Sequence, residues 1–213
     1  MAWHCKAKGA YARDSDEAIE NAKMIYGVLS AQGWTLNAVC GVLGNIGAES
    51  GYNPWRWQSD KIGVSTGFPW NGKGYGLVQF TTSGATEIKY IDNPLAKQFD
   101  GYGPNFSDKD GNVNDGNAQM LYVDGYADYY STSSYPMSYA DFKVSDLDSG
   151  YLAKVWLSNY ERPPDIPSKE PVRASEAEYW YQVLSGEPPI PPTPSGSLSF
   201  IEKFMIIRRF FRG

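Results

Sequence analysis

The segment "TLNAVCGVLGNIGAESG", residues 35 to 51, constrains the fold of this chain more than any other stretch. Thr35 is a suitable N-cap for a helix, and Gly51 with Pro54 provides a stop signal. Apart from Glu49 the segment carries no charged side chain. A helix with so few polar residues is expected to be buried on nearly all sides. Glycines inside it lower its helix propensity, so we expect another element to pack very close to them.

Helical spacing of apolar residues predicts further helices on both sides of this segment. Two of them begin with a capping-box pattern, Asp14 with Glu17 and Ser175 with Glu178. The ranges expected to be helical are 14 to about 33, 117 to 130, 149 to 160 and 175 to 186.

One short segment is typical of β structure. The run "YGLVQFT", residues 75 to 81, follows the turn signal "NGKG" and is predicted to be a short strand. Together with the helices, this strand indicates an α+β fold class that is mainly α.

The composition changes after residue 186. Residues 187 to 197, "EPPIPPTPSGS", are typical of a semi-rigid linker. Residues 198 to 213 form an apolar and basic peptide that is too short to be a domain. We therefore divide the chain into an N-terminal lead-in (1–13), one domain (14–186), the linker and the C-terminal peptide. Exposed, such a peptide would favour aggregation, so we expect it to dock on a partner, contact a membrane surface or fold back.

Charge and residue usage exclude several kinds of function. The net charge is −5 and the sequence pI is about 4.9, which argues against a nucleic-acid partner. His4 is the one histidine, so a His-dependent triad or a multi-His metal site is close to excluded. Cys40 lies on an apolar helix face, and we expect a buried free thiol rather than a disulfide with Cys5. We expect neither a secretory signal nor a membrane span.

Glu49 is the first acidic residue of the buried helix and a candidate for chemistry. Loss of water disfavours the charged form of a carboxyl group and raises its pKa. A carboxylic acid of raised pKa is what protonation of a glycosidic oxygen needs near neutral pH. The alternative is a solvent-exposed glutamate at a helix end, and helical spacing alone leaves both interpretations open.

Eight short motifs follow one another between residues 20 and 186. They are "GWT" (33–35), "GVLGN" (41–45), "ES" (49–50), "NPWRW" (53–57), "GLVQ" (76–79), "YERP" (160–163), "AEYWY" (177–181) and "LSG" (184–186). In this order they resemble the phage tail lysozyme family, a branch of the lysozyme-like superfamily made of peptidoglycan-degrading domains at phage tail tips. The Glu-Ser pair and the later Gly-Leu-x-Gln segment are shared with the wider superfamily.

The resemblance implies a lysozyme-like fold with a small β element beside the cleft. It also implies cleavage of the β-1,4 bond between N-acetylmuramic acid and N-acetylglucosamine. Glu49 matches the catalytic acid of the family. Gln79 matches a strand residue whose amide faces the cleft and binds an acetamido group; the alternative is a solvent-facing polar side chain.

Four further residues are candidates for substrate binding. Ser50 belongs to the Glu-Ser pair, and Tyr160 lies where related transglycosylases place a tyrosine near the catalytic glutamate. Trp55 and Trp57 belong to the "NPWRW" motif and could stack on sugar rings, since Tyr and Trp combine an apolar body with a polar tip. For Tyr160 and at least one of the tryptophans, packing in the core is an equal alternative.

A second catalytic carboxylate is not assigned by any motif. Asp60 and Glu87 flank the predicted strand and are candidates, although loop charges of this kind are usually solvated. If neither faces Glu49, a mechanism with one glutamate is favoured, with water or the sugar's own 6-hydroxyl as acceptor. We interpret Glu161 and Arg162 as a structural charge pair.

We expect no cofactor and no metal. Within residues 107 to 117, "SDKDGNVNDGN", acidic and amide residues alternate as in a calcium-binding loop that starts at Asp108, but the sixth position of that loop is Val113 and the twelfth is Gln119. A polar, turn-rich insertion is the better interpretation.

The sequence therefore predicts a glycan-cleaving peptidoglycan hydrolase, with the glycan strands of the wall as its substrate. We expect it on a phage tail or released by the phage as an endolysin. Residues 198 to 213 are expected to bind another phage tail protein. The alternatives are a lytic transglycosylase that yields anhydro-muramyl products, and a non-catalytic structural or binding tail protein of the same fold.

Overall fold

The computed structural model is mainly helical over the residues that it describes, which are 3–6, 8–56, 58–60, 74–81, 115–125 and 129–186. Its elements in chain order are α1 (Asp16–Ser30), α2 (Leu36–Ser50), the short 3-10 helix η1 (Gln58–Asp60), β1 (Gly74–Tyr75), β2 (Phe80–Thr81), α4 (Asp115–Gly125), α5 (Tyr139–Lys143), α6 (Ser149–Trp156), the π-helical turn η4 (Leu157–Glu161) and α7 (Ile166–Ser185). Among the described residues, no helix is both long and apolar enough to cross a membrane.

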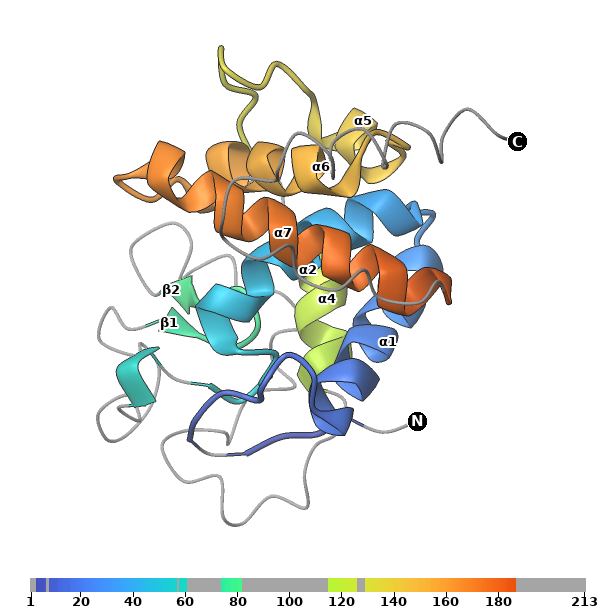
Figure 1. Ribbon diagram of the computed structural model, residues 1–213, viewed down its shortest axis with the longest axis vertical. Helices are drawn as coiled ribbons and strands as arrows, with labels where there is room; N and C mark the ends of the chain where they lie inside the picture. Colours follow the sequence, from blue (N-terminus) through green and yellow to red (C-terminus); the bar gives the residue numbers. More distant parts are fainter. Residues whose placement is uncertain are drawn as a thin grey trace, which may run out of the picture.

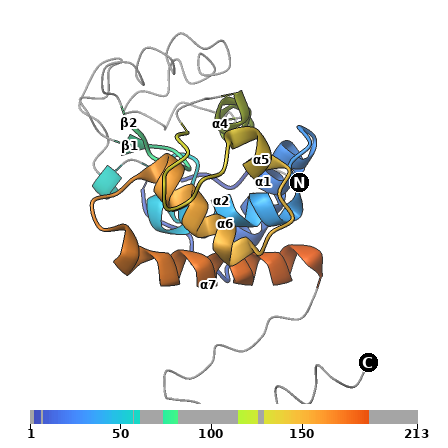
Figure 2. The same ribbon diagram turned by 90° about the horizontal axis from the view of Figure 1, so that it is seen from above.

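Helix α2 lies at the centre of the fold, as its composition predicts. Residues 38 to 46 of this helix are all buried. Helices α6 and α7 pack on it, α1 packs on it from another direction, and α4 packs on α1 (Figures 1 and 2). The predicted ends of α2 are confirmed: the Thr35 hydroxyl accepts a hydrogen bond from the Ala38 amide, and Gly51 adopts a left-handed conformation.

Two glycines of α2 allow its neighbours to approach closely. A Cβ atom on Gly41 would lie 2.9 Å from the Leu152 Cβ of α6. A Cβ atom on Gly44 would lie 2.5 Å from the Arg173 carbonyl oxygen of α7. Neither separation is compatible with a side chain at the glycine. The predicted close packing is therefore confirmed, and it determines how near α6 and α7 lie to α2.

Two predicted helix starts are wrong. Ser15, not Asp14, caps α1, and its hydroxyl accepts a hydrogen bond from the Ala18 amide. Helix α7 begins at Ile166, well before the predicted start at Ser175. Pro171 lies inside α7 on an exposed face. The carbonyl that its missing N–H leaves unbonded can therefore be hydrated.

Residues 75 to 81 are not one strand. They belong to two two-residue antiparallel strands, with Gly74 opposite Thr81 and Tyr75 opposite Phe80, joined by a turn over residues 76 to 79. Both Gly76 and Gln79 have positive φ angles in this turn, which single-strand geometry does not allow.

Buried Gln119 of α4 fixes this β1–β2 hairpin on the helical body. Its side-chain oxygen accepts a hydrogen bond of 2.6 Å from the Leu77 amide, and its Nε2 donates to the Pro54 carbonyl at 2.7 Å. The hairpin thus lies near the C-terminal end of α2 (Figure 1).

The helix predicted over residues 149 to 160 is present as α6, but its last turn widens into the π-helical η4. The helix predicted over 117 to 130 is observed as the shorter α4. The predicted linker and C-terminal peptide, residues 187 to 213, lie outside the described residues.

We predict that Gly44→Ala lowers the free energy of unfolding by about 1–3 kcal/mol, because the added methyl group meets α7 backbone that cannot rotate away. Gly27→Ala, at an exposed position of α1, is the matched control. Nothing lies within 4 Å of a Cβ atom at this position, and we expect the free energy of unfolding to rise by about 0.5–1 kcal/mol. Chemical denaturation measures both. Equal effects of the two substitutions would contradict close packing at Gly44.

Candidate active site

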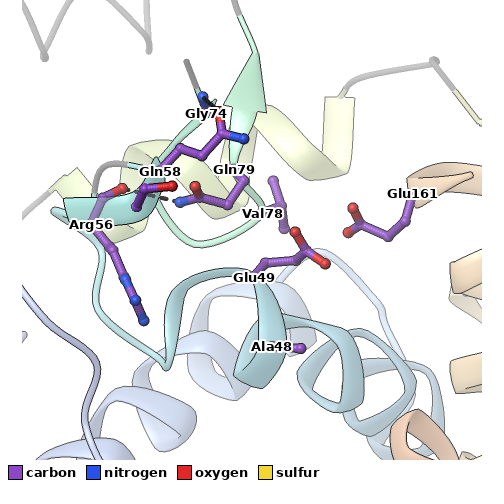
Figure 3. A pocket seen from close by; sticks show the side chains of 9 residues that line it. Ala48, Glu49, Arg56, Gln58, Gly74, Val78, Gln79 and Glu161 are labelled. Carbon is purple, nitrogen blue, oxygen red and sulfur yellow. Dashed lines mark hydrogen bonds between the residues drawn. The ribbon is translucent and has the colours of Figure 1, made fainter. Parts of the chain in front are cut away.

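A cavity of about 510 Å³ opens at the C-terminal end of α2. Its walls come from α2, the segment around η1, the β1–β2 hairpin and η4 (Figure 3). The lining residues are Ala48, Glu49, Arg56, Gln58, Ser59, Gly74, Val78, Gln79 and Glu161. Two carboxylates therefore share one polar cavity.

Glu49 is held by a buried arginine. It lies in the last turn of α2 with 25% of its side chain exposed, and its Oε1 accepts a hydrogen bond of 2.7 Å from Nη2 of Arg173. The Arg173 side chain is only 8% exposed, and its Nη1 donates to the Asn45 carbonyl at 3.1 Å. Both terminal nitrogens of the Arg173 guanidinium therefore donate hydrogen bonds, which fixes its position, and its positive charge compensates a negative charge on Glu49.

Glu161 faces Glu49 across the cavity (Figure 3). Its side chain is half-buried and accepts a hydrogen bond of 3.1 Å from the indole N–H of Trp156. Burial and, to a smaller extent, the negative charge of the facing Glu49 raise the pKa of Glu161 to about 8. The Trp156 hydrogen bond and the charges of Arg173 and Arg162 act in the opposite direction, but they are weaker.

The π-helical turn η4 places Glu161 in the cavity. In a π-helix the hydrogen bonds join residues five apart, and the Arg162 amide donates to the Leu157 carbonyl in this way at 2.8 Å. Trp156 and Glu161 are also five residues apart, so the wider turn brings the indole N–H to the carboxylate. Arg162 then ends the turn in a left-handed conformation.

The hairpin side of the cavity carries amide groups. The Gln79 side chain donates from Nε2 to the Arg56 carbonyl at 3.0 Å and to the Gly76 carbonyl at 2.9 Å. The side-chain oxygen of Gln58 accepts a hydrogen bond of 3.1 Å from the Gly74 amide. These contacts fix the orientation of both amides opposite Glu49 and Glu161 (Figure 3).

The other residues predicted for substrate binding have different surroundings. Trp55 is buried in the core, so the prediction that it stacks on a sugar ring is wrong. Ser50 is also fully buried and donates to the Ile46 carbonyl, so its hydroxyl does not reach substrate. Tyr160 is half-buried and stacks on Trp156, with ring centroids 4.2 Å apart. Trp57 lies outside the described residues.

Of the two predicted candidates for a second carboxylate, Asp60 is engaged elsewhere. It forms an ion pair of 3.3 Å with Arg56 and accepts a hydrogen bond from the Gly9 amide. It is not among the described residues that line the cavity. Glu87 lies outside the described residues.

Two important residues were assigned otherwise, or not at all, from the sequence. Glu161 was interpreted only as a structural partner of Arg162, but it lines the cavity, where the charge of Arg162 acts to lower its pKa. Arg162 also lies over the Tyr130 ring and donates to the Asn159 carbonyl. Arg173 was not singled out. The available signal was its helical spacing with two apolar residues, Ala177 and Trp180, which places a cation on the buried face of α7.

Within the described part of the chain, no group of three or more His, Cys, Asp or Glu side chains is arranged to hold a metal. Residues 107 to 114, which carry the calcium-like pattern, lie outside that part. No disulfide joins Cys5 to Cys40, and the Cys40 thiol is buried as predicted.

Comparison with known proteins gave two findings. The family model for phage tail lysozymes matches residues 20–184. Morphogenesis protein 1 of Bacillus phage B103 is 32% identical over 187 residues, which cover 85% of this chain. The same alignment covers 43% of the phage B103 protein, so the chain spans less than half the length of that relative.

We predict that Glu161→Gln stabilises the protein increasingly as the pH rises. The pKa of Glu161 is higher in the folded state, about 8, than its ordinary value of 4.5. Folding therefore opposes ionisation of this group, and stability is lost as the pH rises through this interval. Glutamine does not ionise, so the difference in Tm between Glu161→Gln and the wild type should grow between these two pH values. A difference that shrinks over the same interval would contradict the assignment.

Proposed function

Because this chain belongs to the phage tail lysozyme family, we propose that it hydrolyses the β-1,4 bond between N-acetylmuramic acid and N-acetylglucosamine in peptidoglycan. The family implies a lysozyme-like enzyme that acts on the bacterial cell wall. The bond and the mechanism are our proposal, and the site geometry supports them.

The observation that carries the proposal is the pair of carboxylates, Glu49 and Glu161, facing each other in one cavity. Hydrolysis of a glycosidic bond commonly uses two carboxyl groups, one protonated and one ionised, on either side of the bond. The two groups here have different surroundings: Glu49 binds a guanidinium, and Glu161 is half-buried beside an indole. Such a difference separates the roles of acid and base.

The second carboxylate favours hydrolysis over transglycosylation. A mechanism with one glutamate would be the better proposal if no other carboxylate faced Glu49. Since Glu161 does, a second carboxyl group is available for proton transfer during the attack of a water molecule. Water rather than the sugar's own 6-hydroxyl is then the acceptor, and the product is a reducing sugar.

The rest of the cavity suits a glycan chain. Hydroxyl and acetamido groups of a sugar require polar partners, and amide side chains from the hairpin and from η1 lie in the wall. We retain Gln79 as the residue that binds an acetamido group, since its fixed carbonyl oxygen can accept a hydrogen bond from the acetamido N–H.

The biological setting is also a proposal. We infer that the protein acts from the phage tail during cell-wall penetration, with its C-terminal peptide, residues 198 to 213, bound to another tail protein. Its relative in Bacillus phage B103 is named a morphogenesis protein, which supports a place in the virion. Release as an endolysin is the alternative setting.

We predict that Glu49→Gln lowers the rate of wall clearing by about 10²–10⁴-fold, because the substituted amide can neither give nor accept the catalytic proton. Loss of turbidity of a purified cell-wall suspension measures the rate. Glu178→Gln, on an exposed position of α7, is the control and should clear walls like the wild type.

Mass spectrometry of the released fragments tests the acceptor. Hydrolysis leaves reducing muramic acid ends, whereas transglycosylation leaves anhydro ends that lack one water. Anhydro products would overturn hydrolysis, and equal clearing by the wild type and Glu49→Gln would overturn catalysis at this site.

A further inference from the structure

We propose that a second, smaller cavity beside the candidate active site binds the stem peptide that muramic acid carries in peptidoglycan. The proposal rests on the cleavage of wall glycan in the larger cavity, and it concerns the part of the substrate that extends beyond that cavity. Its consequence is that the protein acts on peptide-bearing glycan in preference to bare glycan.

The smaller cavity has a volume of about 250 Å³. Its walls come from the N-terminal segment (Ala10, Tyr11 and Arg13), from the end of α2, from the turn at Gly51 and Tyr52, and from α7. Cavities that hold a whole drug-sized ligand measure roughly 300–1,000 Å³. The smaller cavity therefore suits a short part of a longer ligand.

The two cavities are adjacent at the C-terminal end of α2. Ala48, the neighbour of Glu49, is exposed and lines both of them (Figure 3). Arg56 of the larger cavity also borders the smaller one. Its Nη1 lies 3.4 Å from the place that a Cβ atom on Gly51 would take, and Gly51 lines the smaller cavity. A ligand in the larger cavity can therefore continue over the Ala48 methyl group into the smaller one.

The walls of the two cavities differ in chemistry. Amide and charged side chains line the larger cavity, and these suit the hydroxyl and acetamido groups of a sugar. The smaller cavity instead presents three exposed apolar side chains, those of Ala10, Ala48 and Val172. Val172 is 60% exposed although it is a large apolar residue. Apolar groups gathered in a concave wall suit a ligand with small apolar groups better than a sugar ring.

Arg13 places a positive charge at the smaller cavity. Its Nη1 donates to Oε1 of Glu176 at 2.8 Å, and its guanidinium lies 4.2 Å from the centroid of the Tyr179 ring. The other oxygen of Glu176 accepts a hydrogen bond of 3.0 Å from the Tyr52 hydroxyl. These contacts hold Arg13 in place, yet 41% of its side chain is exposed. Its charge is therefore accessible to an acidic group of a ligand.

A stem peptide has the attachment and the chemistry that this arrangement requires. It is joined to muramic acid through a lactyl group, so it leaves the glycan from the side. The stem of a muramic acid bound in the larger cavity therefore crosses an edge of that cavity, and at Ala48 it meets the smaller one. The stem begins with a small residue, most often alanine, and continues with a residue that carries a carboxyl group. This order matches an apolar wall with a cation beside it.

Val172→Trp tests the subsite by filling the smaller cavity. Val172 is exposed on α7 and lines the smaller cavity but not the larger one, so the new side chain leaves the facing carboxylates untouched. Val144→Trp is the matched control, because it makes the same change at a valine that is 61% exposed and lines neither cavity. Both variants are compared with the wild type on soluble glycan chains that carry uncrosslinked stem peptides, and on the same chains after an amidase has removed the peptides. Chromatography with mass spectrometry measures the fragments.

We expect Val172→Trp to lower kcat/KM on the peptide-bearing chains by roughly tenfold or more, the size of effect that one small apolar group has in a binding site. On the peptide-free chains it should resemble the wild type, and Val144→Trp should resemble the wild type on both. The wild type itself should cleave the peptide-bearing chains faster. Equal losses of Val172→Trp on the two kinds of chain, or no loss on the peptide-bearing chains, would overturn the subsite.

Binding of a small probe tests the same subsite without catalysis. In a methyl NMR titration of the wild type, the signals of Val172 and Ala10 should move with N-acetylmuramyl-L-alanyl-D-isoglutamine and stay in place with N-acetylmuramic acid, which lacks the peptide. If both signals stay in place with the peptide-bearing probe, the smaller cavity is not a stem-peptide site. If the wild type cleaves neither kind of chain, the proposed function fails, and this titration alone decides whether the smaller cavity binds the peptide.

Discussion

The contact between Gly44 and the backbone at Arg173 determines how this candidate active site is built. Since Gly44 has no side chain, α7 lies so close to α2 that a Cβ atom on Gly44 would be only 2.5 Å from the Arg173 carbonyl oxygen. At this separation the Arg173 side chain reaches along α2 to the Asn45 carbonyl and then to Glu49 in the last turn. Because α2 is apolar, it is covered by other helices. One of them, α7, carries the Arg173 cation that binds the single carboxylate of α2.

A second carboxylate is brought to the same cavity by a local departure from helical geometry. Because η4 is wider than an α-helix, Glu161 returns to the side of Trp156 and faces Glu49. Two facing carboxylates in a partly buried cavity destabilise the fold when both are ionised, and burial of Glu161 adds to that effect. Such a cost is expected at a site whose chemistry needs one proton held near neutral pH.

The sequence predicts the central helix well, because its signals are local. The cap at Thr35 and the left-handed stop at Gly51 depend on a few neighbouring residues, and both are confirmed. The predicted start of α7 is wrong because the capping-box pattern of Ser175 and Glu178 lies inside a helix that tertiary packing on α2 extends back to Ile166. The roles of Glu161 and Arg173 depend on residues more than 100 positions away in the chain, and no spacing rule could bring either to Glu49. Within the site, the sequence therefore identified the first carboxylate but not its two partners.

The central claim is that Glu49 and Glu161 face each other in one cavity, so that the charge of Glu49 raises the pKa of Glu161. Carbon-13 NMR titration of the glutamate side-chain carboxyls, assigned with Glu161→Gln and Glu49→Gln, measures this directly. We predict that Glu161 titrates far above the ordinary pKa of a glutamate, and that Glu49→Gln lowers its midpoint by removing the facing charge. A Glu161 midpoint near 4.5 that does not respond to Glu49→Gln would contradict the account.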